Sequence, residues 1–158
     1  MDSRSVVASF FACWSVQDLE MAVAHAHPEF VYTIHNGRDA SPLAGVYRGP
    51  DECRDLGYAM LAEFDYLNYE PAIVGVEDNI VRAQVNFRYR HRATGNIIEG
   101  SRRLVFEIKD DLIYRLDSYE DTLRLEAFMR MSREVPPSGD LLEQFDLEIG
   151  RQKSGAGA

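Results

Sequence analysis

The sequence is poor in the features that mark disulfide-stapled, membrane-spanning and nucleic-acid-binding proteins. It has two cysteines in 158 residues, and both fall on apolar sides of predicted helices, so we expect buried free thiols and a reducing, cytoplasmic location. The apolar run at residues 6–14 is too short to cross a bilayer, and acidic residues follow it. The net charge of −9 argues against binding to a phosphate backbone. We therefore expect a soluble protein that binds neither membranes nor nucleic acid.

Motifs for metals, cofactors and nucleophilic catalysis are missing from the sequence as well. No set of histidine, aspartate and glutamate residues has metal-ligand spacing, and no glycine-rich loop follows a predicted strand to hold a phosphate. Serine, cysteine and lysine side chains lack a visible partner that would activate them. We expect no cofactor and no metal.

The order of predicted elements indicates one α+β domain. Helical spacing of apolar residues predicts helices near residues 4–16 and 18–25, and a third after Pro50. Strands are predicted at 30–35 and 67–76, the second kept to an edge or a bend by Pro71, with residues 36–49 as a loop. Alternating residues from 81 to 119 then predict three more strands. Helices gathered at one end predict a cone-shaped, curved antiparallel sheet wrapped on N-terminal helices.

The domain boundary is predicted near residue 133. Residues 1–133 form the cone domain and end in a helix at 121–133. Residues 134–158 form an extension, in which 140–149 have the pattern of a short amphipathic helix and 150–158 that of a disordered tail.

A few charged residues fall among apolar ones in the predicted sheet. Arg102 interrupts an apolar face, and Arg115, Asp117 and Tyr119 share one face of the last strand. Because a buried charge costs several kcal/mol unless it is paired, these residues predict a pocket with a polar floor. By hydrophobicity alone, however, the alternate set with Leu116 would face the core and leave Asp117 in solvent.

Two roles are predicted for each of Arg102 and His35. Arg102 is predicted to pair with Asp117 across the hairpin, either as a structural ion pair or as a donor to a substrate oxygen. His35 ends the first strand at the mouth of the cone, where an imidazole serves as an acid or base, or caps the turn.

The order of elements and several stretches of sequence resemble the nuclear transport factor 2-like superfamily, which includes ketosteroid isomerases and SnoaL-like polyketide cyclases. The matching stretches are residues 6–14, 17–19, 27–32, 43–49 and 113–121, so the resemblance covers about residues 4–132. It implies a cone with a pocket for a small hydrophobic ligand and a homodimer formed through the outer face of the sheet.

The resemblance argues against one activity of that superfamily. Ketosteroid isomerases use a tyrosine on the first helix and two aspartates on strands, and the corresponding residues here are Phe10, Ile34 and Leu104. None of these exchanges a proton, so steroid isomerisation by that route is not expected unless His35 replaces the base. SnoaL-like cyclases place an acidic residue toward the late strands, the region of Asp117.

The predicted function is therefore a cofactor-independent acid–base enzyme of the cyclase, isomerase or hydrolase kind. In it Asp117 acts as base, Arg102 steadies negative charge, and His35 or Tyr119 relays protons. The predicted substrate-binding residues are Phe10, Trp14, Ile34, Tyr58, Phe64, Phe87, Tyr89, Leu104, Phe106 and Arg115. Such aromatic residues equally describe a filled core. A non-catalytic binding or accessory module and a purely structural dimer are the alternatives.

Overall fold

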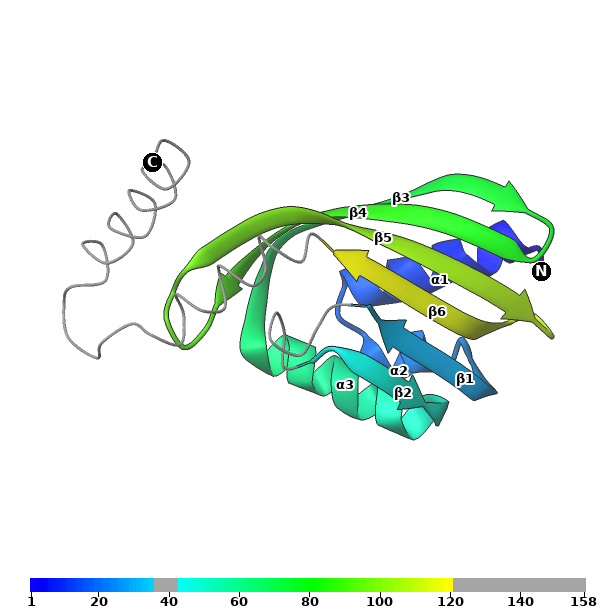
Figure 1. The fold of residues 1–158 in the computed structure, drawn as a ribbon, viewed down its shortest axis with the longest axis horizontal. Helices are drawn as coiled ribbons and strands as arrows, with labels where there is room; N and C mark the ends of the chain where they lie inside the picture. The colour runs from blue at the N-terminus through cyan, green and yellow to red at the C-terminus, as the bar shows by residue number, and fades with distance from the viewer. Residues whose placement is uncertain (36–42, 121–158) are drawn as a thin grey trace, which may run out of the picture.

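The computed structural model describes residues 1–35 and 43–120 (Figure 1). Along the chain, all three helices come before the last four strands. The elements are α1 (Ser3–Ser15), α2 (Leu19–Val23), β1 (Ala26–Ile34), β2 (Gly45–Arg48), α3 (Gly49–Glu63), β3 (Phe64–Glu77), β4 (Ile80–His91), β5 (Ile97–Lys109) and β6 (Leu112–Glu120). The three predicted helices of this range are confirmed, as are the strands of the meander. The helices predicted at 121–133 and 140–149, and the tail, lie outside the described residues.

The six strands form one curved, mixed sheet in the order β2-β1-β6-β5-β4-β3. The α+β class is confirmed, but the sheet is not wholly antiparallel, because β1 runs parallel to β6 with Thr33 opposite Asp117. The sheet arches over the helices, which lie on its concave side (Figure 1). Pro71 lies in β3, which is an edge strand. Proline has no N–H to donate to a neighbouring strand, and at an edge one side of the strand has no neighbour.

Two short stretches differ from the sequence-based prediction. Residues 45–48 form strand β2 beside β1 inside the predicted loop, and β1 begins at Ala26 rather than at residue 30. β2 forms by pairing with β1, and β1 begins early because Ala26 pairs with Ile113 of β6. Short sequence patterns do not reveal such pairing.

Local signals in the sequence fix the helix starts. Asp2 caps α1 by accepting a hydrogen bond from the Ser5 N–H at 2.7 Å, and Asp18 caps α2 by accepting one from the Met21 N–H at 3.2 Å. Proline follows Gly49 at the start of α3, with two acids in its first turn.

The core has two parts, and residues of both line one cavity. In the first part, Phe106 is fully buried and its ring meets those of Phe10 and Phe11 at 5.8 and 5.5 Å. The second part joins the three helices and contains Trp14 and Leu19. Each such large apolar side chain contributes about 1.5–3 kcal/mol when it is buried. In the described part of the chain, no helix has the length and apolarity that crossing a membrane requires.

Candidate functional site

A cavity lies between the helices and the concave face of the sheet. Together with the open space at its mouth, it holds about 680 Å³ that no atom fills. Its walls are mostly apolar, which is typical of a site for a small molecule. The lining residues are Phe10, Trp14, Leu19, Ala22, Val23, Ala26, Phe30, Tyr32, Cys53, Leu56, Gly57, Met60, Tyr69, Arg102, Leu104, Ile113 and Leu116.

Arg102 and Glu120 form a buried ion pair at this cavity. They lie directly opposite each other in β5 and β6, and Nη2 of Arg102 donates to Oε1 of Glu120. The two side chains are 16% and 9% exposed. Nε of Arg102 is buried, and among the described residues it has no hydrogen-bond partner. Since buried donors are nearly always satisfied, this free N–H points to a missing partner.

Charge and burial oppose each other at Arg102. Burial alone would lower its pKa, but the Glu120 carboxylate raises it, as do the hydroxyls of Tyr89 and Tyr32, so the net pKa lies well above the ordinary value. Arg102 therefore keeps its positive charge while it is held in an apolar cavity.

Tyrosine hydroxyls surround the guanidinium. Tyr32 and Tyr69 line the cavity, and burial raises the pKa of both phenols, although nearby Arg102 lowers it in part. Tyr66 and Tyr89 stack behind them, with ring centroids 4.2 Å apart, and burial also raises their pKa values. All four phenols thus stay protonated at neutral pH, and those at the wall supply hydroxyl donors.

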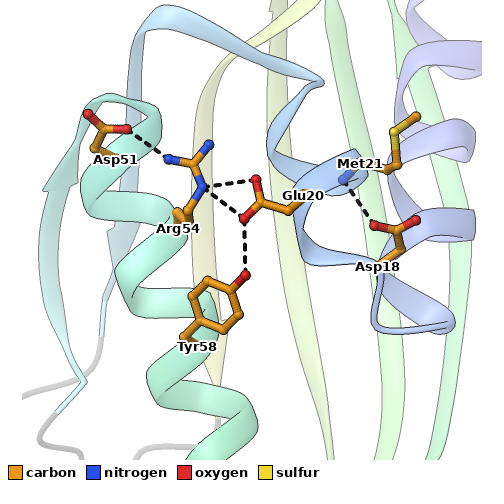
Figure 2. A network of polar contacts seen from close by, with 6 residues as sticks. All are labelled: Asp18, Glu20, Met21, Asp51, Arg54 and Tyr58. Atoms are coloured by element: carbon orange, nitrogen blue, oxygen red, sulfur yellow. Dashed lines mark hydrogen bonds and ion pairs between the residues drawn. The ribbon is translucent and has the colours of Figure 1, made fainter.

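Helices α2 and α3 close one side of the cavity. Inside, Leu19 packs so tightly on Gly57 that a Cβ built on the glycine would lie 2.5 Å from Cδ1 of Leu19. Outside, Figure 2 shows Glu20 of α2 between two side chains of α3. Its carboxylate accepts from Nε of Arg54 at 3.1 Å and from the Tyr58 hydroxyl at 3.0 Å. Asp51 and then Glu20 raise the pKa of Arg54. This outer network holds the short helix α2 in place over the cavity.

Comparison with known proteins places the chain in a family. The sequence profile of the SnoaL-like domain matches residues 7–116, which is more than half of the chain. The chain belongs to the SnoaL-like domain family. No curated protein matches it.

Solved structures share the fold of this SnoaL-like domain. An NTF2-like protein from Burkholderia thailandensis is 22% identical, with a TM-score of 0.73 over 82% of this chain and 98% of that one. A protein from Mesorhizobium loti described as a SnoaL-like polyketide cyclase is 14% identical, with a TM-score of 0.65 over 75% and 99%. An LEH-like epoxide hydrolase from M. tuberculosis is 15% identical, with a TM-score of 0.63 over 78% and 85%.

Asp117 lies outside the cavity, which corrects the prediction that it faces inward. In this SnoaL-like domain Leu116 and Ser118 are 2% and 1% exposed and face the core, so Asp117 between them points to the other side of the sheet. There its Oδ1 lies 2.7 Å from Nε2 of His35, whose ring stacks on Tyr119 at 4.4 Å. Three predicted catalytic residues therefore meet, but not at the cavity, and their catalytic roles stay predictions.

A bulge in β6 is the physical reason for this difference. Ile113 lies opposite Ile108 and Arg115 lies opposite Glu107, so Tyr114 between them is an extra residue in β6. Without it, Leu104 would lie opposite Asp117. With it, every later residue of β6 is shifted by one position and changes face. The predicted pair of Arg102 with Asp117 is therefore wrong, and Glu120 takes that place.

The predicted substrate-binding residues divide into two groups. Phe10, Trp14 and Leu104 line the cavity, as does Arg102. The other residues do not: Tyr58 is 52% exposed and bonded to Glu20, and Arg115 is exposed beside Glu107. The remaining five pack in the core and do not line the cavity: Ile34, Phe64, Phe87, Tyr89 and Phe106.

Sequence reasoning missed Glu120, Tyr32 and Tyr69. A carboxylate opposite Arg102 was expected, but the bulge hid which one. The two tyrosines lie on strands that were predicted correctly in type. Each follows a shift of strand register, between Ala26 and Val31 in β1 and between Tyr66 and Asn68 in β3, and such a shift changes which face a side chain lies on. Among the described residues, no group of three or more histidine, cysteine, aspartate or glutamate side chains is placed to hold a metal ion.

Proposed function

We propose that this SnoaL-like domain is a cofactor-independent enzyme that carries out acid–base chemistry on a small, largely apolar molecule in the cavity. The observation that carries the proposal is the Arg102–Glu120 pair, a guanidinium and a carboxylate buried where the apolar walls meet the sheet. Among apolar walls of low dielectric, such charged groups act more strongly on a reacting molecule than they would in bulk water.

Proton abstraction next to a carbonyl group fits these two side chains. The C–H bond breaks, the proton passes to the Glu120 carboxylate, and the electron pair moves into an enolate whose oxygen accepts from Arg102. Because Glu120 touches the guanidinium but is not itself part of the cavity wall, one water carries the proton between substrate and carboxylate. Glu120 thus takes the role of base that the sequence suggested for Asp117.

Structures that share the fold are compatible with this chemistry. Besides the cyclase and the epoxide hydrolase, they include proteins described as isomerases, from Rhodopseudomonas palustris and Bacillus subtilis. These are reactions on small organic molecules, and they support the reaction class without giving the substrate of this chain.

Exchange of hydrogen for deuterium tests the proposal without knowledge of the natural substrate. Acetophenone is incubated with the protein in D2O, and NMR follows the loss of its methyl proton signal. We expect exchange above the uncatalysed rate, and a fall of at least about a hundredfold in Glu120→Gln. Glu99→Gln is the matched control, because Glu99 pairs with Arg88 at the surface, 3.1 Å away. Equal rates with and without protein contradict the proposal.

A non-catalytic binding module is the second candidate, and one observation favours it. Among the described residues that line the cavity, none has a carboxylate or an imidazole. A protein that only binds needs no such group in its wall. This candidate predicts saturable binding of acetophenone with no deuterium exchange at any protein concentration.

The chain is also proposed to form a homodimer through the outer face of the sheet. Apolar side chains are exposed there, with Val74 at 65% and Tyr119 at 45%. They line a groove together with Arg103 and Val105. Sedimentation velocity tests this: Val74→Lys should shift the protein from dimer to monomer. Val16→Lys serves as the control, because Val16 is an exposed valine at the end of α1 and does not lie on the sheet. A monomer in the unmodified protein contradicts it.

A further inference from the structure

We infer that the cavity selects a neutral molecule whose hydrogen-bond-accepting oxygen, such as a ketone oxygen, lies at Arg102, and that it rejects carboxylates. The inference rests on the proposed function for the choice of cavity, but it concerns which ligand binds and not whether it reacts.

The balance of charge carries the first step. Arg102 is the one charged side chain among the described residues that line the cavity, and Glu120 already neutralises it. A carboxylate ligand bound at the guanidinium would place a second negative charge close to Glu120. In a cavity of low dielectric, one positive charge does not compensate two negative ones, so the carboxylate loses its hydration without a matching gain.

The surplus of donors carries the second step. Nε–H of Arg102 has no partner among the described residues, and a guanidinium has no acceptor to offer. Tyr32 and Tyr69 add hydroxyl donors at the same wall. A ligand that enters must therefore supply an acceptor, and an oxygen placed here relieves the cost of an unsatisfied buried donor.

The apolar walls determine the polarity and charge of the rest of the ligand. Apart from Tyr32, Tyr69, Arg102 and Cys53, the lining is formed by apolar side chains, one tryptophan and a glycine. Burial raises the pKa of the Cys53 thiol to about 12, so this thiol remains uncharged and adds no anion to the wall. The ligand class is thus an apolar body with one acceptor oxygen and no net charge.

Three probes of nearly equal shape test the inference. Acetophenone has the acceptor oxygen, α-methylstyrene replaces this oxygen by CH2, and benzoate replaces the methyl group by a second, charged oxygen. Trp14 reports binding directly, because it is the single tryptophan of the chain and lines the cavity, so its indole N–H signal can be followed by NMR titration. We expect acetophenone to bind at least about tenfold more tightly than benzoate.

Two variants separate charge from hydrogen bonding. Glu120→Gln removes the neutralising charge, so benzoate should gain at least about tenfold in affinity while acetophenone changes by less than about threefold. Arg102→Lys keeps the ion pair but removes Nε–H, so acetophenone should lose about tenfold relative to α-methylstyrene. Circular dichroism checks the folding of each variant. If Glu120→Gln does not fold, the unmodified protein and Arg102→Lys carry the test.

The outcomes are distinct. Benzoate binding as tightly as acetophenone in the unmodified protein overturns the inference, and so does an Arg102→Lys variant with unchanged relative affinities. Absence of any change at Trp14 with all three probes overturns it as well. If acetophenone binds selectively but exchanges no deuterium, the inference stands and the proposed enzyme function fails. If deuterium exchange occurs but benzoate binds as tightly as acetophenone, the proposed enzyme function stands and the inference about ligand selection fails.

Discussion

His35 and Asp117, which are 82 residues apart in the sequence, form a hydrogen-bonded pair where β1 and β6 run parallel. Their side chains are 37% and 35% exposed, and they lie on the side of the sheet away from the cavity. Because solvent screens a pair with this exposure, it joins the two strands without adding much to stability. The pair shows that a cluster of titratable residues can form on this fold without contact with the cavity.

Asp117→Asn should therefore have small effects on both stability and binding. We expect the free energy of unfolding, measured with urea, to fall by less than about 1 kcal/mol. The affinity for acetophenone, read from the Trp14 signal, should change by less than about twofold, because Asp117 does not line the cavity. A loss of affinity comparable with that of Arg102→Lys would place Asp117 in contact with the ligand.

Much of the fold was predictable because its signals are local. In β4 the alternation seen in the sequence is the alternation seen in the structure, with each second residue from Val81 to His91 buried. His91, the polar member of that set, is satisfied by Glu63 at 2.5 Å and Thr94 at 3.0 Å. The helix starts follow from capping residues and from the proline of α3.

The candidate site was less predictable because one residue decides it. Asp110 and Asp111 both have positive φ, as a two-residue hairpin turn requires, and such a turn depends on local residues alone. The bulge at Tyr114 was not visible, because it depends on how β6 meets β5 and β1 together. The bulge turns Glu120 toward the core and Asp117 to the outer face of the sheet. A carboxylate paired with Arg102 was therefore predicted correctly, but the residue that supplies it was not.

Arg102→Met should destabilise the protein strongly. The change leaves the Glu120 carboxylate buried at 9% exposure without its partner, which costs about 3–5 kcal/mol in comparable pairs. The double variant Arg102→Met, Glu120→Gln removes both charges and should regain most of that loss. Urea unfolding of the three variants, including Glu120→Gln alone, forms a double-mutant cycle. Equal stability of Arg102→Met and the unmodified protein would show that the pair is solvated.

Tyr69 and Tyr58 offer a matched test of the cavity wall. Both are tyrosines, but Tyr69 lines the cavity, whereas Tyr58 is on the outer face of α3 and donates to Glu20. Tyr69→Phe removes a donor near Arg102 and should weaken acetophenone binding by a few-fold relative to α-methylstyrene. Tyr58→Phe should leave that ratio unchanged and lower the free energy of unfolding by less than about 1 kcal/mol. Equal effects on the ratio would contradict the assigned wall.

Cys53 predicts how stability depends on alkaline pH. Burial, and secondarily the Glu52 carboxylate, raises the pKa of the folded thiol to about 12. Between its ordinary unfolded value near 9 and that value, the unfolded chain loses this proton and the folded chain keeps it. Stability from this group is thus complete below pH 9 and falls as pH rises, by up to about 1.4 kcal/mol per pH unit.

Urea unfolding between pH 8.5 and 10 measures this loss, since the buried tyrosines begin to contribute only above their ordinary pKa near 10. Cys53→Ala removes the titrating thiol and should flatten the dependence in that interval. A slope that persists in Cys53→Ala would assign the alkaline loss to another group. A flat profile in the unmodified protein would mean that the thiol reaches water in the folded state, and that the cavity wall beside α3 is open there.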